Sequence, residues 1–401
     1  MAFVSHNQDI AAAWAYHDGT KHSFDSVRRS AHMLDFTNQP RPWKLYQDDL
    51  PFVQLSPSLL SSGVAALDAI STAAAPSPEP LVPSLEQLTA VLLLSAGVTK
   101  QLPMRGGRMA FRAAACTGAL YHIELYVVCQ DLDGLSAGVY QFSVHDNRLR
   151  RLREGDHRAT VAAATGGDEA VAQAPVIIAY TSTFWRNAWK YQSRAYRHAY
   201  WDSGTILANA LSAANAHGLP AKAVAGFVDD EVNALLDVDA ETEAAVALLP
   251  LGQTDAPLPE APSVERLHLP VVPPSRREID YPAIREMHVA SSLVSPGEAA
   301  AWRERLAGLP GPPAPDTGLV AVASGQDTQT KPLEEVIIKR GSSRRFEQES
   351  ISYAQLSTVL ARAAGPVPLD GAPESMPLLV TPYVIANDVD GLEPDAYVYH
   401  R

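Results

Sequence analysis

The chain has 401 residues, enough for two or three domains, and its hydrophobic content of 46% can supply packed cores. Its net charge of −13 argues against a dedicated nucleic-acid-binding protein. Cys116 and Cys129 are the two cysteines, too few for a disulfide framework. With no basic–apolar leader at its start and no run of 18 apolar residues, we expect a soluble, cytoplasmic protein that does not bind membranes.

Residues 1–82 are expected to be an N-terminal extension of irregular and short helical structure. Its histidines His17, His22 and His32 have a spacing that fits no standard metal site. We therefore predict structural roles for them and no bound metal.

Residues 83–254 are expected to form a first α+β unit. Ser84 and Gln87 make a capping box, and apolar residues follow at helical spacing up to Gly97. Apolar runs predict strands at 123–129, 138–142, 175–180 and 244–249, and helices are predicted at 184–198 and 202–217. This irregular alternation favours a mixed sheet flanked by helices.

Residues 255–330 form a Pro-rich connector, in which Ser295 and Pro296 predict the start of one helix that runs to about Leu306. A second unit, 331–401, follows. It repeats the first in two places, because the segments 84–97 and 126–135 return at 352–365 and 383–392. Such a duplication can create within one chain the two-fold interface of a homodimer.

The two copies differ in what they carry. The offset between them falls from 268 residues at the helix to 257 at the strand, so the second copy lacks part of the loop that precedes the strand. It also ends soon after its second strand, which indicates either a fragment or an incomplete unit; the sheet edge this would expose favours a fragment. In the other direction, the basic residues before the second helix have no counterpart at 71–78.

Three stretches could carry chemistry. The cluster Arg340–Arg345 could bind an anion, because guanidinium groups match phosphate oxygens and Ser342 adds a hydroxyl; a solvated basic patch is the alternative. The small residues between Arg112 and Tyr121 would let backbone amides face a planar ligand, unless this is simply a packed junction. Lys190 and Tyr191 could pass a proton, although most of their helix reads as an ordinary amphipathic helix.

Together these stretches resemble the SagB-type (ThcOx-like) dehydrogenases of the FMN-dependent nitroreductase superfamily. The matching motifs are Tyr16-His-Asp-Gly-Thr-Lys-His-Ser23, Arg112…Thr117-Gly-Ala-Leu-Tyr121…Glu124-Leu-Tyr126, Lys190-Tyr191…Arg194-Ala-Tyr-Arg197…Asp202…Gly204…Asn209, and Arg340…Ser342…Arg344…Phe346. Two positions depart from the family pattern: Ala115-Cys116 stands where the family has Pro-Ser, and His122 stands where it has Pro.

The resemblance implies an FMN at the interface of the two units, an intrachain pseudo-dimer. One composite site would hold the flavin. Its phosphate would bind Arg340, Ser342 and Arg344, and its ring would face Arg112, Cys116, Thr117, Gly118, Ala119 and Leu120. Lys190 and Tyr191 match the catalytic pair of azoline-oxidising relatives.

The expected function is two-electron dehydrogenation of a small-molecule or peptide substrate, such as a peptide azoline. Two alternatives remain open. One is an NAD(P)H-dependent nitro or quinone reductase, and the other is a flavin-free, peptide-binding partner lobe. The sequence leaves the electron acceptor and any further association of chains undecided.

Overall fold

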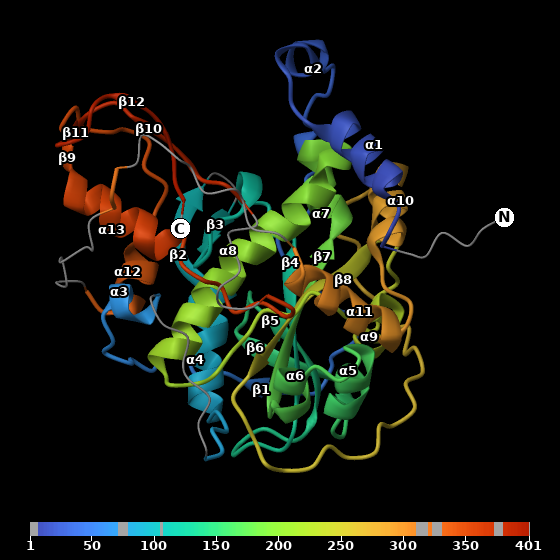
Figure 1. Ribbon diagram of the computed structural model, residues 1–401. Coiled ribbons are helices and arrows are strands. Elements are labelled where there is room, and N and C mark those ends of the chain that lie inside the picture. Colours follow the sequence, from blue (N-terminus) through green and yellow to red (C-terminus); the bar gives the residue numbers. More distant parts are fainter. Residues whose placement is uncertain are drawn as a thin grey trace.

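A six-stranded sheet lies between two layers of helices (Figure 1). The computed structural model describes residues 7–70, 79–104, 107–309, 320–322, 331–372 and 380–400. In sheet order the strands are β1 (Phe52–Gln54), β6 (Arg148–Glu154), β5 (Gly138–Ser143), β4 (Ile123–Cys129), β7 (Val176–Thr183) and β8 (Glu243–Leu251). The predicted α+β fold with a sheet flanked by helices is confirmed.

All pairings within this sheet are antiparallel, which corrects the expected mixture of strand directions. Strands β4, β5 and β6 follow one another through turns that are too short for a parallel crossover. Among the described strands, the one parallel pair is formed by two short strands of the second unit, β9 (Ile351–Ser352) and β11 (Val389–Asp390); isolated parallel bridges also join Ala223 to Leu369 and Val228 to Leu293.

Strand β4 is buried on both faces and separates two hydrophobic cores. Leu125 and Val127 pack toward α4 (Leu85–Ala96) and α8 (Ala195–Ala216). Tyr126 and Val128 pack into the opposite core, whose helices are α5 (Arg158–Ala164), α6 (Glu169–Gln173) and α9 (Asp229–Leu235). Across the described part of the chain, no helix is both long and apolar enough to cross a bilayer.

The central helical region breaks earlier than predicted. Helix α7 (Phe184–Tyr191) ends where Gln192 adopts a left-handed φ of 52°, and the short turn η3 (Gln192–Arg194) leads into α8. The helix α11 (Pro296–Ala307) begins at Ser295 as predicted. Elements the sequence analysis did not anticipate include β1, β6, the hairpin β2 (Val98–Met104) and β3 (Gly107–Arg112), and α10 (Pro282–Ser291).

The N-terminal extension packs on this broken helix. It contains α1 (Ile10–Thr20), α2 (Phe24–Arg29), η1 (Phe36–Asn38) and α3 (Ala66–Ala69). Tyr16 Oη donates to the carbonyl of Ser193 at 2.6 Å, and Arg194 Nη1 donates to the carbonyl of Thr20 at 2.6 Å. Two of the motifs singled out in the sequence therefore touch each other.

The second unit repeats the local geometry of the first. It contains α12 (Leu333–Lys339), α13 (Tyr353–Ala363), β10 (Tyr383–Ala386) and β12 (Asp395–Val398) beside β9 and β11. The capping box of α4 recurs in α13, where Ser352 and Gln355 bond reciprocally.

The hairpins β4–β5 and β10–β12 have the same register. Tyr126 faces Gln141 in the first, and Tyr383 faces Val398 in the second, each 257 residues further along. Their turns share a left-handed glycine, Gly134 and Gly391. The first hairpin is buried, whereas most of the second is exposed.

The two units meet through segments that are equivalent under the repeat. Helix α12 packs against α3, and an antiparallel bridge joins Ala65 to Pro332. The backbone N–H of Leu333 donates to the carbonyl of Val64, and that of Ala66 donates to Lys331. Leu333 and Ile337 enter the core beside α4 and α8, so α12 is anchored in the first unit.

A buried ion pair joins the extension to the sheet. Lys44 Nζ lies 2.8 Å from Glu243 Oε2 and 2.9 Å from Tyr126 Oη, and the side chains of the pair are only 6% and 7% exposed. Burial would raise the pKa of Glu243, but the Lys44 charge and the hydrogen bonds from Lys44, Thr181 and Tyr126 together outweigh it and lower the pKa below 4.5. Glu243 is therefore ionised at neutral pH and needs its partner.

We expect Lys44→Ala to lower the free energy of unfolding by about 3–5 kcal/mol, because it leaves the Glu243 carboxylate buried without its counter-charge. Urea unfolding followed by circular dichroism measures this. The control is Arg285→Ala, which breaks an exposed pair with Asp280 and should change stability little. Equal losses in the two variants would contradict the assigned role of the pair.

Candidate active site

The loop between β3 and β4 is held in an unusual backbone conformation. Gly118, Ala119 and Tyr121 have φ values of 65°, 56° and 49°, all left-handed, around the short turn η2 (Thr117–Ala119). For residues other than glycine such a conformation costs about 1–3 kcal/mol and persists only where the surroundings impose it. Strain of this kind is concentrated at functional sites.

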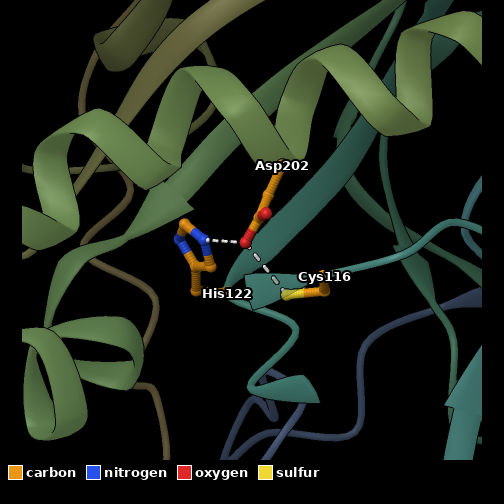
Figure 2. Close-up of side chains that lie close together, drawn as sticks. All are labelled: Cys116, His122 and Asp202. Atoms are coloured by element: carbon orange, nitrogen blue, oxygen red, sulfur yellow. Dashed lines mark hydrogen bonds and ion pairs between the residues drawn. The ribbon is translucent and has the colours of Figure 1, made fainter. Parts of the chain in front are cut away.

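Asp202, on helix α8, imposes this conformation. Its carboxylate accepts hydrogen bonds from the backbone N–H of Thr117 at 3.0 Å and from the Thr117 hydroxyl at 2.7 Å. The Cys116 thiol donates to Asp202 Oδ2 at 3.1 Å, and His122 Nε2 lies 2.9 Å from the same oxygen (Figure 2). One carboxylate therefore ties together both ends of the loop.

The ionisation states follow from burial. Burial lowers the pKa of His122, so its imidazole is neutral, with Nε2 donating to Asp202 and Nδ1 accepting from Ser182. Burial would raise the pKa of Asp202, but the hydrogen bonds from His122, Thr117 and Cys116, together with the electrostatic effect of His122, outweigh it and lower the pKa. Burial and the Asp202 charge both raise the pKa of Cys116, so the thiol stays protonated and can donate.

Cys116, His122 and Asp202 offer ligand atoms within 4.8 Å of one another, a grouping that could hold a metal ion. No such group forms around His17, His22 and His32 in the described parts of the chain. However, the contacts of 2.9 and 3.1 Å in the first group are hydrogen-bond distances between groups whose protons are accounted for. The arrangement is complete as a hydrogen-bonded network.

The predicted catalytic pair lies against this loop. A Cβ built on Gly118 would sit 2.8 Å from Tyr191 Oη and 3.4 Å from Lys190 Cδ, so only glycine fits there. Lys190 Nζ is 5.3 Å from the centroid of the Tyr191 ring. On its other side Tyr191 meets the His198 ring edge-on at 4.5 Å, and burial lowers the pKa of His198 to about 4.

The basic cluster of the second unit reaches the loop through Arg340. Its Nε and Nη2 both donate to the carbonyl of Ala113 at 3.2 Å. Ser342 and Arg344 are exposed, and the hydrogen bonds recorded for the described residues do not join them to the loop. The first-unit stretch 71–78, which lacks basic residues, lies outside the described residues.

Two of the predicted flavin contacts point into the protein. Arg112 is 3% exposed and donates to the carbonyls of Ile123 and Pro42, and burial lowers its pKa. The Leu120 side chain packs with Phe184 and Trp185 in a small core. A flavin contact from Leu120 would therefore come from its backbone.

The sequence analysis did not select His122 or Asp202 as site residues. The two departures from the family pattern, Cys116 and His122, meet in space on Asp202. A signal was present, because Asp202 is the one acidic residue in the 22-residue helix α8 and is buried. Buried carboxylates are rare unless they are paired.

Comparison with known proteins supports this fold. The sequence model described as "Nitroreductase family" matches residues 78–253, somewhat less than half of the chain, so this part of the chain is similar to nitroreductase-family proteins. Among solved structures, a nitroreductase by name from Anabaena variabilis superposes with a TM-score of 0.68 at 24% identity. It covers 97% of this chain and 77% of that one, and the likeness shows a shared fold.

Two curated proteins match part of the chain. MJ1384 of Methanocaldococcus jannaschii, a nitroreductase by name, is 26% identical over 170 residues, which is 42% of this chain and 81% of that protein. The microcin B17-processing protein McbC of Escherichia coli is 27% identical over 132 residues, 32% of this chain. The matched part spans 48% of McbC.

We expect Cys116 to react slowly with iodoacetamide in the folded protein, because its raised pKa keeps the thiolate scarce. Asp202→Asn removes a charge that raises this pKa, so the variant should react faster and its rate–pH profile should shift to lower pH. Mass spectrometry of labelled peptides measures both rates, with urea-unfolded protein as the reference. Labelling of folded wild-type Cys116 at the unfolded rate would contradict the network.

Proposed function

We propose that the chain is an FMN-dependent oxidoreductase that holds one flavin between its two units and removes two electrons from a substrate such as a peptide azoline. The observation that carries the proposal is that residues from both units contact the loop between β3 and β4. Arg340 reaches Ala113 from the second unit, and Lys190 and Tyr191 lie against Gly118 from helix α7.

The residues around this loop fit the cofactor. Arg344 and Ser342 are exposed donors near Arg340 in sequence, which suits a phosphate group. Gly118 is exposed, and Tyr191 lies against it, so a planar ring would approach this loop from the solvent side. Cys116 and Thr117 form the edge of the loop that would face the flavin. Asp202 holds the backbone of this edge in place before a ligand binds.

A single flavin per chain is supported by what replaces the loop in the second unit. After α13 the chain docks on the first unit, where Asp370 is fully buried. Its carboxylate accepts from the backbone N–H groups of Ala225 and Gly226 at 2.9 Å each. In its described residues, 364–372, this segment has no basic side chain that could bind a phosphate.

FMN supplies two-electron redox chemistry when it is bound. The residues of this chain would orient the substrate and move the proton. Tyr191 Oη and Lys190 Cδ lie 2.8 and 3.4 Å from the point where a Cβ of Gly118 would stand, so both side chains reach the loop. Dehydrogenation of an azoline makes a double bond between two ring carbons, and it releases one proton for each hydride removed. The proposed role of Lys190 and Tyr191 is to accept and pass on that proton.

The azoline substrate is suggested by McbC, whose name describes processing of microcin B17, and by the Lys190-Tyr191 pair. The second candidate, an NAD(P)H-dependent nitro or quinone reductase, is favoured by the match to MJ1384 over 81% of that protein. Steady-state consumption of NADPH with nitro or quinone acceptors separates the two. If the purified protein is colourless and does not take up FMN, the remaining hypothesis is the flavin-free, peptide-binding partner lobe.

Flavin titration followed by fluorescence quenching should give one FMN per chain. We expect Arg340→Ala to weaken FMN binding about 10-fold or more, because it removes a charged hydrogen-bond donor. Lys339→Ala is the matched control, since this neighbouring cation pairs with Glu335 at 2.6 Å instead. Two flavins per chain, or equal effects of the two substitutions, would refute the composite site.

Lys190→Met should abolish substrate oxidation while leaving the FMN content unchanged, because it keeps the apolar stem and removes only the amine. Lys190→Ala should behave in the same way. Turnover is measured by product mass, and the flavin by its visible spectrum. Wild-type turnover in either variant would remove Lys190 from the mechanism.

A further inference from the structure

A cavity of about 580 Å³ is lined by residues at the N-terminal end of helix α7, whereas Lys190 and Tyr191 lie at the C-terminal end of that helix. One wall is apolar and comes from Trp43 and the connector residues Val271–Pro274. Thr183 and Arg186, at the start of α7, line the polar side. The volume falls within the range of sites for small molecules, about 300–1,000 Å³.

Two polar atoms at this cavity have no hydrogen-bond partner among the described residues. Arg186 is 1% exposed; its Nη1 donates to Tyr121 and Glu124, but its Nε is unpartnered. Thr183 precedes α7 in the N-cap position, yet its hydroxyl makes no capping bond and is also unpartnered. An unpaired buried donor is costly, so both atoms indicate a missing acceptor.

On the buried side of the cavity the cations outnumber the carboxylates, which favours a negative acceptor there, although Arg266 and the carboxylates Asp237, Asp239 and Glu278 also line the cavity. The buried cations Lys44, Arg112 and Arg186 share two buried carboxylates, Glu124 and Glu243. The N-terminus of α7 adds a partial positive charge beside Thr183.

The acidic residues of the cavity rim do not supply this acceptor. Asp237 and Asp239 accept hydrogen bonds from backbone N–H groups of the surrounding loops. Glu278 is exposed at the mouth. The next carboxylate inside the protein, Asp202, is held by Thr117 and His122.

We propose that this cavity binds a carboxylate-bearing ligand. One carboxylate oxygen would accept from Arg186 Nε and the other from the Thr183 hydroxyl, and an apolar body would lie on Val271–Pro274. A free small acid and the C-terminal carboxylate of a peptide share this chemistry. The site is separate from the proposed flavin site, and the two communicate through Arg186, which also holds the carbonyl of Tyr121.

Calorimetry on the full chain tests this with N-benzoylglycine and its uncharged isostere N-benzoylglycinamide. An acetylated tripeptide acid and its C-terminal amide form the second arm. We expect each acid to bind at least about 10-fold more tightly than its amide, because hydrogen bonds to charged groups are the stronger ones. The tighter of the two acids identifies the source of the carboxylate.

Thr183→Val should weaken acid binding about 10-fold without loss of stability, because the removed hydroxyl has no partner in the protein. Thr160→Val is the matched control: its hydroxyl is also unpartnered, but it lies on α5 and does not line the cavity. No binding of either acid at millimolar concentration, equal affinity for acid and amide, or equal effects of the two valine variants would each overturn the proposal. None of these measurements requires flavin or turnover.

Discussion

Buried charges at the centre of the first unit fix the positions of four segments that are distant in sequence. Glu124 on β4 accepts from the backbone of Lys44 and from Arg186 on α7, while Glu243 on β8 binds the Lys44 ammonium. Because an unpaired charge in a low-dielectric interior is very costly, none of these segments can shift alone. Arg186 also holds the carbonyl of Tyr121, so the same network fixes the end of the loop between β3 and β4.

The two units supply different parts of the proposed composite site. The first retains the complete sheet, the loop held by Asp202 and the helix that carries Lys190. The second contributes Arg340 and is anchored by α12, which packs beside its own counterpart α3. An interface between unequal copies can hold residues that neither copy would present alone, and this asymmetry makes a single composite site a natural arrangement.

Local signals made much of this predictable. The capping boxes at Ser84 and Ser352 and the apolar run of β7 predicted helices and a strand close to those observed. Local sequence patterns failed to predict elements whose structure depends on contacts between residues distant in the sequence. Strand β6 is rich in arginine and pairs only because β1 and β5 flank it, and the break at Gln192 follows from packing against the extension. Likewise, Asp202 can bind His122 only in the folded chain, because the two residues are 80 positions apart in the sequence.

Burial and turn geometry usually determine strand pairing together. The hairpins β4–β5 and β10–β12 differ in burial but have the same turn geometry and the same register. One hairpin is enclosed by helices and the other faces water, yet the partners are the same and Tyr140 and Tyr397 even make the same bond, each to the carbonyl four residues before it. Alignment here is thus encoded by the turn and its tyrosine, independently of enclosure. Evolution could therefore replace the outward-facing side chains of the later ribbon freely, and a new recognition surface could arise there without any risk of misaligned strands.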